Sequence, residues 1–219
     1  MLLQDALTKS NKGDLLIDLA ELASGLALVG FLWIHMLFVG TVIIGPDIFN
    51  KVPVFLEKYL LSQIGIPMVI ILIILHMILA GRRLSNRFSD MKIVYKHSRL
   101  LGHWDTWTWL FQCITGVAIG ILAAAHIWTV VSKWDINIAI SSERVFQSPY
   151  FIFYIVLLLS GEYHAGVGLY REFIKWGWID RKKIGWVLNA ITICIITLGI
   201  VSLFVLKGYY VISGAGGAE

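Results

Sequence analysis

Four histidines and one glutamate lie inside long apolar segments of this 219-residue chain. The histidines are His35, His76, His126 and His164, and each belongs to a different segment. Glu162 precedes His164 by two residues. Polar side chains are costly in hydrocarbon and mark a site by default. These five residues are therefore the first candidates for chemistry.

Imidazoles that face each other from different helices suit the two axial positions of a haem. A macrocycle between helices also needs room, and small residues lie near these histidines, among them Gly116, Gly120, Gly161 and Gly168. Two alternatives remain open at this point. The histidines could form a proton or ion pathway, or they could be hydrogen-bonded packing residues, with the glycines only allowing close helix contact.

The segments that carry these residues are long enough to cross a membrane. Of all residues, 58% are apolar and 15% are charged, and the mean hydropathy is +0.79. A spanning helix needs about 20 mostly apolar residues. Such helices are expected at 22–45, 64–80, 106–131, 149–170 and 186–206. The chain 1–219 is thus predicted to be a single all-α domain, a five-helix membrane bundle.

The basic residues predict the orientation of the bundle. The N-terminal segment and the loops after the second and fourth helices hold 13 Lys and Arg, and the opposite side holds 5. Basic loops stay in the cytoplasm, so the N-terminus is expected inside and the C-terminus outside. The net charge of +4 therefore reflects basic loops on the cytoplasmic side of the membrane. It does not indicate binding to nucleic acid, and no nucleic-acid partner is expected.

The rise of 1.5 Å per residue places the histidines at two depths. His35 and His126 come roughly 15 and 8 Å from the outer ends of their helices. His76 and His164 come roughly 6–10 Å from the inner surface. We therefore expect an outer pair, His35 with His126, and an inner pair, His76 with His164.

Five segments around these residues resemble one known family: WIHMLFVGTVIIG around His35, LHMILAGRR around His76, GHWDTWTWLFQ from Gly102, AAAHIW around His126 and GEYHAGVGLYREFIKWGW around His164. They are similar, in order and spacing, to the dihaem cytochrome b subunit of quinol:fumarate reductases and succinate:quinone oxidoreductases. The resemblance is strongest to the single-chain, five-helix type and covers residues 20–206.

The resemblance implies two haems b on the same axial pairs, in a bacterial cytoplasmic membrane. It further implies an iron–sulfur subunit docked on the cytoplasmic face and a flavoprotein subunit that carries FAD and interconverts fumarate and succinate. Menaquinol would be the electron donor, and two such complexes would associate side by side as a dimer of heterotrimers.

Two carboxylates acquire roles through this resemblance. Oxidation of a quinol needs a base, and Glu57, in the outer loop, matches the family's quinol-site glutamate. Glu162 matches a glutamate thought to carry protons across the membrane. The simpler interpretations are a solvated loop residue for Glu57 and a carboxyl that only hydrogen-bonds a neighbouring helix for Glu162.

Haem propionates need cationic or hydrogen-bonding partners. Lys175 and Trp109 match the family's positions for the inner haem, and Arg144 and Tyr154 match those for the outer haem. Snorkelling cations and an interfacial Trp109 are the alternatives. Where the family has a Gln-Ser pair, this chain has Glu21 and Leu22, with Ser24 as a possible substitute.

Other basic residues belong to the predicted cytoplasmic loop. His97 and His103 are expected to face solvent or the partner subunit. Arg82, Arg83 and Arg87 are expected to set the topology and to contribute to a docking surface.

Two other functions also fit a histidine-bearing bundle. The chain could be the cytochrome b subunit of a hydrogenase or formate dehydrogenase. It could also be a haem-free, proton-coupled transporter, although such folds usually show internal repeats and broken helices, and neither is visible here.

Overall fold

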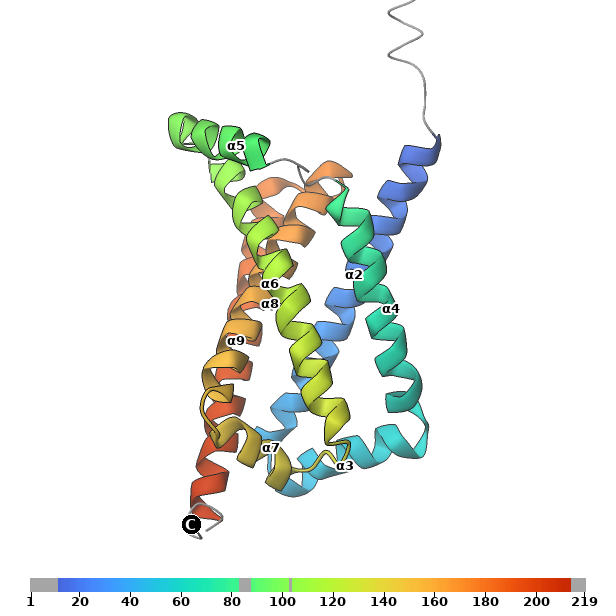
Figure 1. Ribbon diagram of the computed structural model, residues 1–219, viewed down its shortest axis with the longest axis vertical. Helices are drawn as coiled ribbons and strands as arrows, with labels where there is room; N and C mark the ends of the chain where they lie inside the picture. The colour runs from blue at the N-terminus through green and yellow to red at the C-terminus, as the bar shows by residue number, and fades with distance from the viewer. Residues whose placement is uncertain (1–11, 83–87, 103, 214–219) are drawn as a thin grey trace, which may run out of the picture.

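A computed structural model describes residues 12–82, 88–102 and 104–213. Within these residues the chain is all-helical (Figure 1). Five helices are long and apolar enough to span a membrane: α2 (Lys12–Gly40), α4 (Leu61–Gly81), α6 (Trp104–Ser132), α8 (Tyr150–Lys175) and α9 (Arg181–Ile212). The five predicted spans are thereby confirmed, and the chain is a multi-pass membrane protein.

Several spanning helices are longer than the sequence analysis predicted. The first begins at Lys12 instead of residue 22, and the last runs from Arg181 to Ile212 instead of 186–206. The backbone hydrogen bonds of a helix continue past its apolar part into more polar surroundings. Charged residues such as Asp14 and Asp18 are therefore part of the helix, although hydropathy excludes them from the span.

Three shorter helices connect the spans: α3 (Pro46–Lys58), α5 (Phe88–Leu101) and α7 (Ile138–Phe146). A 3-10 turn, η1 (Thr41–Ile43), leads from α2 to α3 through Gly45, whose φ of 151° favours glycine. Pro46 then begins α3, where a missing N–H has no cost. In Figure 1, α3 and α7 lie at one end of the bundle and α5 lies at the other. These are called the α3/α7 end and the α5 end.

Helices α8 and α9 pack against each other along the bundle, α2 and α6 flank them, and α4 packs on α2. The apolar core has three clusters. One at the α3/α7 end includes Val42, Phe49 and Leu203. A middle cluster contains Met36, Leu158 and Ile195, and a third, toward the α5 end, contains Leu169, Ile184 and Leu188.

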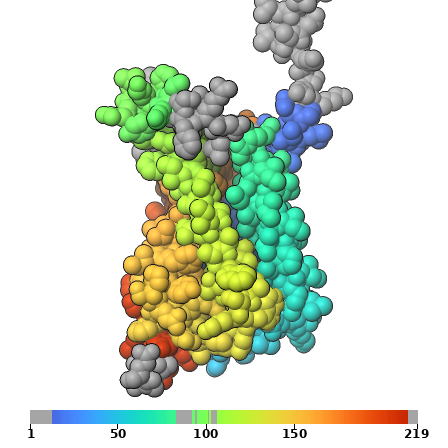
Figure 2. Space-filling model, in the orientation of Figure 1, coloured from blue at the N-terminus to red at the C-terminus, as the bar shows by residue number. Residues whose placement is uncertain are grey.

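Large apolar side chains also cover the outer surface of the spanning helices. Ile71 is 65% exposed, Ile121 67% and Ile193 66%. Such a surface suits hydrocarbon and would be a liability in water. In Figure 2, α4 and α6 lie on the near face beside part of α8, and toward the α5 end the space-filling surface is hollowed between α4 and α6.

Candidate functional site

The outer pair of histidines meets between α2 and α6. The ring centres of His35 and His126 are 6.0 Å apart, with an interplanar angle of 58°. Phe31 stacks on His35 at 5.7 Å, and the ring of Tyr154 meets His126 edge to face at 5.6 Å. The structure therefore brings together two residues that lie 91 positions apart in the sequence.

This spacing fits two imidazoles that share one metal ion. A metal–imidazole bond is about 2 Å long, so two axial imidazoles have ring centres roughly 6 Å apart. Within the described residues, no group of three or more His, Cys, Asp or Glu could hold a metal ion. A pair of imidazoles suits haem, because the porphyrin supplies the other four ligands.

Buried polar atoms without partners lie beside the outer pair. Among the described residues, Nδ1 of His126 and Nη2 of Arg144 are buried and make no hydrogen bond. Arg144 lies close enough to Tyr154 for a side-chain hydrogen bond. A cavity of about 190 Å³ opens here, and Lys133, Arg144 and Tyr150 contribute to its lining. A buried guanidinium nitrogen without a partner is costly, so an acceptor such as a propionate oxygen fits beside Nη2 of Arg144.

In the inner pair, the Nδ1 atoms of His76 and His164 both make hydrogen bonds to neighbouring helices. Nδ1 of His164 lies 3.0 Å from the backbone carbonyl oxygen of Gln112 on α6. A carbonyl only accepts hydrogen bonds, so Nδ1 of His164 carries the proton and Nε2 keeps a free lone pair. Nδ1 of His76 lies 3.0 Å from Oγ of Ser24 on α2. His76 and His164 are also close enough to interact electrostatically.

Glycines give these inner imidazoles room. A Cβ added at Gly116 on α6 would lie 2.9 Å from Cε1 of His164, and one at Gly25 on α2 would lie 3.1 Å from Cε1 of His76. Each ring therefore rests against the backbone of a neighbouring helix. Gly120 faces Met77 and Gly168 faces the Gln112 side chain, so these two serve helix packing around the site.

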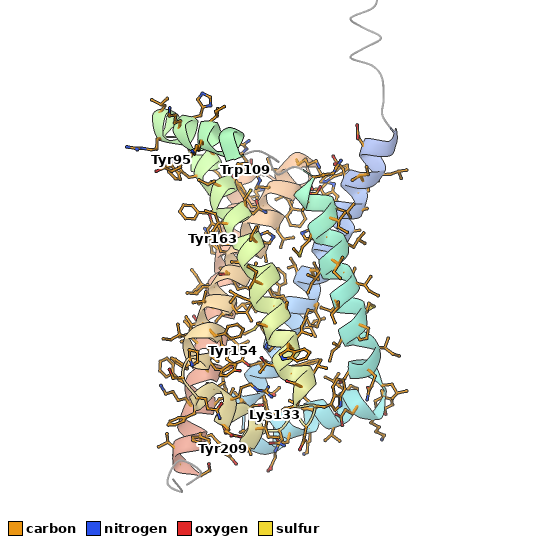
Figure 3. The ribbon with its side chains drawn as sticks, viewed as in Figure 1. Tyr95, Trp109, Lys133, Tyr154, Tyr163 and Tyr209 are labelled. Carbon is orange, nitrogen blue, oxygen red and sulfur yellow. The ribbon has the colours of Figure 1, made fainter. Side chains whose placement is uncertain are left out.

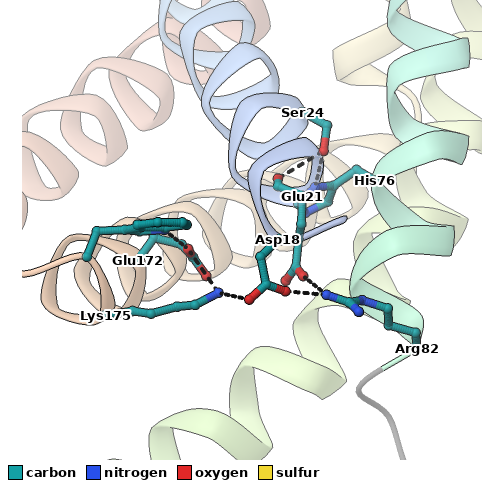
Figure 4. Close-up of polar contacts among 8 residues, drawn as sticks. Asp18, Glu21, Ser24, His76, Arg82, Glu172 and Lys175 are labelled. Atoms are coloured by element: carbon teal, nitrogen blue, oxygen red, sulfur yellow. Dashed lines mark hydrogen bonds and ion pairs between the residues drawn. The ribbon is translucent and has the colours of Figure 1, made fainter. Parts of the chain in front are cut away.

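The α5 end carries a cluster of charges that joins three helices (Figure 4). Nζ of Lys175 on α8 lies 2.9 Å from Asp18 Oδ2 on α2. Arg82, at the end of α4, also pairs with Asp18 and lies 3.8 Å from Glu21 Oε2. Lys175 was expected to meet an inner propionate, and it is at the expected end, where its charge is shared with Asp18.

The other expected propionate partners lie at opposite ends of the bundle. Figure 3 shows Trp109 toward the α5 end and Tyr154 toward the α3/α7 end. Tyr154 therefore lies at the end of the outer pair, where its ring contacts His126, and Trp109 lies at the opposite end. Ser24, the possible propionate substitute, instead directs its oxygen to His76.

The two carboxylates have contrasting surroundings. Glu162 on α8 is 1% exposed, and neither oxygen has a hydrogen-bond partner within the described part of the chain. The indole N–H of Trp33 on α2 faces Glu162, but the two groups do not meet the geometry of a direct hydrogen bond. Glu57 is exposed on α3, at the same end as the outer pair. The described rings that contact that pair belong to Phe31 and Tyr154.

Comparisons with known proteins show which family the chain belongs to. Residues 89–206 match the family model described as succinate dehydrogenase/fumarate reductase transmembrane subunit. The chain is 32% identical over 199 residues to the fumarate reductase cytochrome b subunit of Helicobacter pylori strain J99. The aligned residues cover 84% of this chain and 77% of that protein. It is 31% identical over 175 residues to the subunit of the same name from Wolinella succinogenes, covering 76% of this chain and 68% of that one.

The chain belongs to the succinate dehydrogenase/fumarate reductase transmembrane subunit family.

This membership confirms the resemblance seen in the sequence. It makes the chain a membrane subunit of an enzyme complex, and it favours neither the haem-free transporter nor the hydrogenase or formate dehydrogenase subunit. His97 of this transmembrane subunit is exposed on α5, as expected. His103, Arg83 and Arg87 lie outside the described residues.

Three residues of this transmembrane subunit were missed or misjudged from sequence. Ser24 was considered only for a propionate, and Trp33 and Gln112 were not singled out. Gln112 acts through its backbone carbonyl, for which side-chain identity gives no signal. The contact between Trp33 and Glu162 depends on the rotation of α2 against α8, which hydropathy does not determine. The contact of Ser24 with a histidine could have been considered from sequence, because Ser24 is a hydroxyl residue in an apolar stretch.

Proposed function

We propose that this transmembrane subunit binds two haems b and oxidises menaquinol for a fumarate reductase in the bacterial cytoplasmic membrane. The observation that carries the proposal is the arrangement of four half-buried histidines as two cross-helix pairs at two depths. Support also comes from relatives named fumarate reductase cytochrome b subunits. When bound, the haems would carry single electrons from the outer side to the inner side.

The histidines and the charged residues have separate tasks in this proposal. His35 and His126 hold the outer iron, and His76 and His164 hold the inner iron. Arg144 and Tyr154 bind the outer propionates, and Lys175 and Trp109 bind the inner ones. Because Lys175 also pairs with Asp18, it acts within a charged cluster that keeps its ammonium at the inner end.

Glu57 and Glu162 handle protons. Quinol oxidation releases protons at the outer side, and the exposed carboxylate of Glu57 accepts one there. Fumarate reduction consumes protons at the inner side. Glu162 returns one proton through the bundle for each electron, two per quinol, so that electron transfer separates no net charge. Its two buried, unpartnered oxygens suit a group that gains and loses a proton instead of one fixed in an ion pair.

The partners follow from the same proposal. An iron–sulfur subunit docks at the α5 end, where Lys92, Lys96 and Arg99 are exposed. It would accept electrons at the inner side of this subunit and pass them to a flavoprotein subunit with FAD. The chain itself would not bind fumarate, and two such complexes would associate as a dimer of heterotrimers.

Purification of the tagged chain from its native membrane tests the proposal. We expect two soluble subunits to co-purify, together with fumarate reduction driven by a menaquinol analogue. A viologen dye, which donates electrons directly to the soluble subunits, serves as the control donor. A complex that reduces fumarate with the dye but never with the quinol would contradict the proposed quinol-oxidising role.

A further inference from the structure

Ser24 occupies an unusual position for a serine in a membrane span. Its side chain is buried, with 3% of the residue exposed, and it lies on α2 opposite α4. Oγ makes two contacts: 2.9 Å to the backbone carbonyl of Glu21 and 3.0 Å to Nδ1 of His76. Of the two, the contact to His76 joins different helices.

The two contacts together determine where the protons are. The Glu21 carbonyl can only accept, so the single hydroxyl proton of Ser24 is donated to it. The Ser24 oxygen must therefore accept from His76, and Nδ1 of His76 carries the donated hydrogen. A neutral imidazole has one N–H, so Nε2 of His76 is left with its lone pair free for a metal ion.

Gly25, the next residue, packs against the imidazole ring of His76. A Cβ at Gly25 would lie 3.1 Å from Cε1 of His76, tighter than an ordinary contact. The imidazole is thus hydrogen-bonded by residue 24 and packed against the backbone of residue 25. Both residues belong to α2, although the ring belongs to α4.

We infer that Ser24 is a positioning residue for the inner haem, which holds His76 with Nε2 presented to the iron. The inference rests on the proposed function, in which His76 and His164 are the inner axial ligands. A hydrogen bond from the second ring nitrogen fixes ring orientation and raises the basicity of a metal-bound imidazole. A more basic ligand favours the oxidised iron, so Ser24 should lower the reduction potential of the inner haem.

The effect should be confined to one haem. His164 is anchored by the backbone carbonyl of Gln112, which no substitution removes. Nδ1 of His126 in the outer pair has no partner among the described residues. Loss of the Ser24 hydroxyl therefore changes the inner site alone.

The test is a redox titration of the purified holo-complex, with EPR spectra of both low-spin haems. The inner haem is defined as the one lost in His76→Ala. For Ser24→Ala we expect this haem to become easier to reduce by roughly threefold in its oxidised-to-reduced ratio, or about 30 mV at 59 mV per tenfold. Its EPR g values should shift, and those of the outer haem should stay.

Three further variants make the result specific. Ser24→Thr keeps the hydroxyl and should restore the wild-type potential. Gly25→Ala keeps the hydroxyl but crowds the ring, and it should disturb the same haem. Ser202→Ala removes another buried hydroxyl, which donates to Leu198 O on α9, and should change neither haem.

The outcomes separate this inference from the proposed function. If His76→Ala removes one haem but Ser24→Ala behaves like Ser202→Ala, the role of Ser24 is wrong and the haem assignment survives. A shift in the outer haem on Ser24→Ala also overturns the inference. If His76→Ala leaves both haems in place, the proposed function and the inference fail together.

Discussion

Glu57 and Glu162 are both carboxylates of a membrane protein, yet their surroundings differ in water access. Glu57 is exposed at the α3/α7 end, and Glu162 is enclosed between α8 and α2. An exposed carboxylate can exchange protons with water, whereas a buried carboxylate without a partner is expensive. At the scale of single residues, these environments support the proposed proton uptake by Glu57 and proton transit through Glu162.

Replacement of Glu57 tests proton uptake. General-base catalysis contributes about 10²–10⁴-fold to a rate, so Glu57→Gln should lower quinol-driven fumarate reduction by at least about 100-fold. Activity with the viologen dye should persist, because the dye bypasses this residue. Asp47→Asn, an exposed change on the same helix, is the control. A Glu57→Gln enzyme with normal quinol activity would contradict the assignment.

Replacement of Glu162 tests proton transit. A glutamine has similar size but carries no exchangeable acid, so Glu162→Gln should slow quinol-driven turnover by roughly 10-fold or more while haem content stays unchanged. The measurement is steady-state activity in liposomes with each donor. Asp135→Asn, at an exposed carboxylate outside the spanning helices, is the control and should be near wild type. Equal activities of the two variants would exclude Glu162 from the path.

At the scale of helices, the packing of α8 and α9 depends on a glycine. A Cβ at Gly199 on α9 would lie 2.6 Å from Cδ2 of Leu158 and 2.8 Å from Cε of Met36. The backbone of α9 therefore touches side chains of α8 and α2 in the middle core cluster. This close approach holds α9 against α8 and α2, two of the helices that carry the histidine pairs.

Gly199→Ala should accordingly destabilise the bundle. Overpacking costs about 1–3 kcal/mol, and each kcal/mol corresponds to about 2–4 °C in Tm for a chain of this size. Thermal unfolding in detergent measures the change. Gly208→Ala on the same helix, where a Cβ meets nothing within 4 Å, is the control and should not lower Tm. A Gly199→Ala protein as stable as this control would show that the contact is unimportant.

Helices were predictable to different degrees. The five spans follow from hydropathy, because a membrane requires long apolar helices. The pairing of His35 with His126 also agrees with the depths estimated from helix rise. Helices α3, α5 and α7 were not predicted, since short amphipathic segments resemble loops in a hydropathy analysis. Contacts such as Ser24 with His76 depend on helix rotation, which depth alone leaves open.

At the scale of the whole molecule, the two ends of the bundle differ in charge. The α5 end carries Arg82, Lys92, Lys96, Arg99, Lys175 and the three basic residues that begin α9. The α3/α7 end carries fewer cations. This asymmetry predicts that the α5 end faces the cytoplasm, which is the side on which the proposed iron–sulfur partner would dock.

Cysteine labelling in intact cells tests this orientation. In a background with Cys113 and Cys194 replaced, Asp47→Cys should react with a membrane-impermeant maleimide added outside. Lys183→Cys, at the α5 end but outside the residues proposed for docking, should react only after the cells are permeabilised. Both positions are exposed, on α3 and α9 respectively. Labelling of Lys183→Cys in intact cells would reverse the topology and the proposed docking side.

The most direct test of the account is the haem content of complexes in which each of the four histidines is replaced by alanine. The measurement is haem quantification with a reduced-minus-oxidised spectrum. We predict two haems b in the wild type, loss of one in His35→Ala and His126→Ala, and loss of the other in His76→Ala and His164→Ala. A colourless wild-type complex, or a histidine variant that keeps both low-spin haems, would contradict the account.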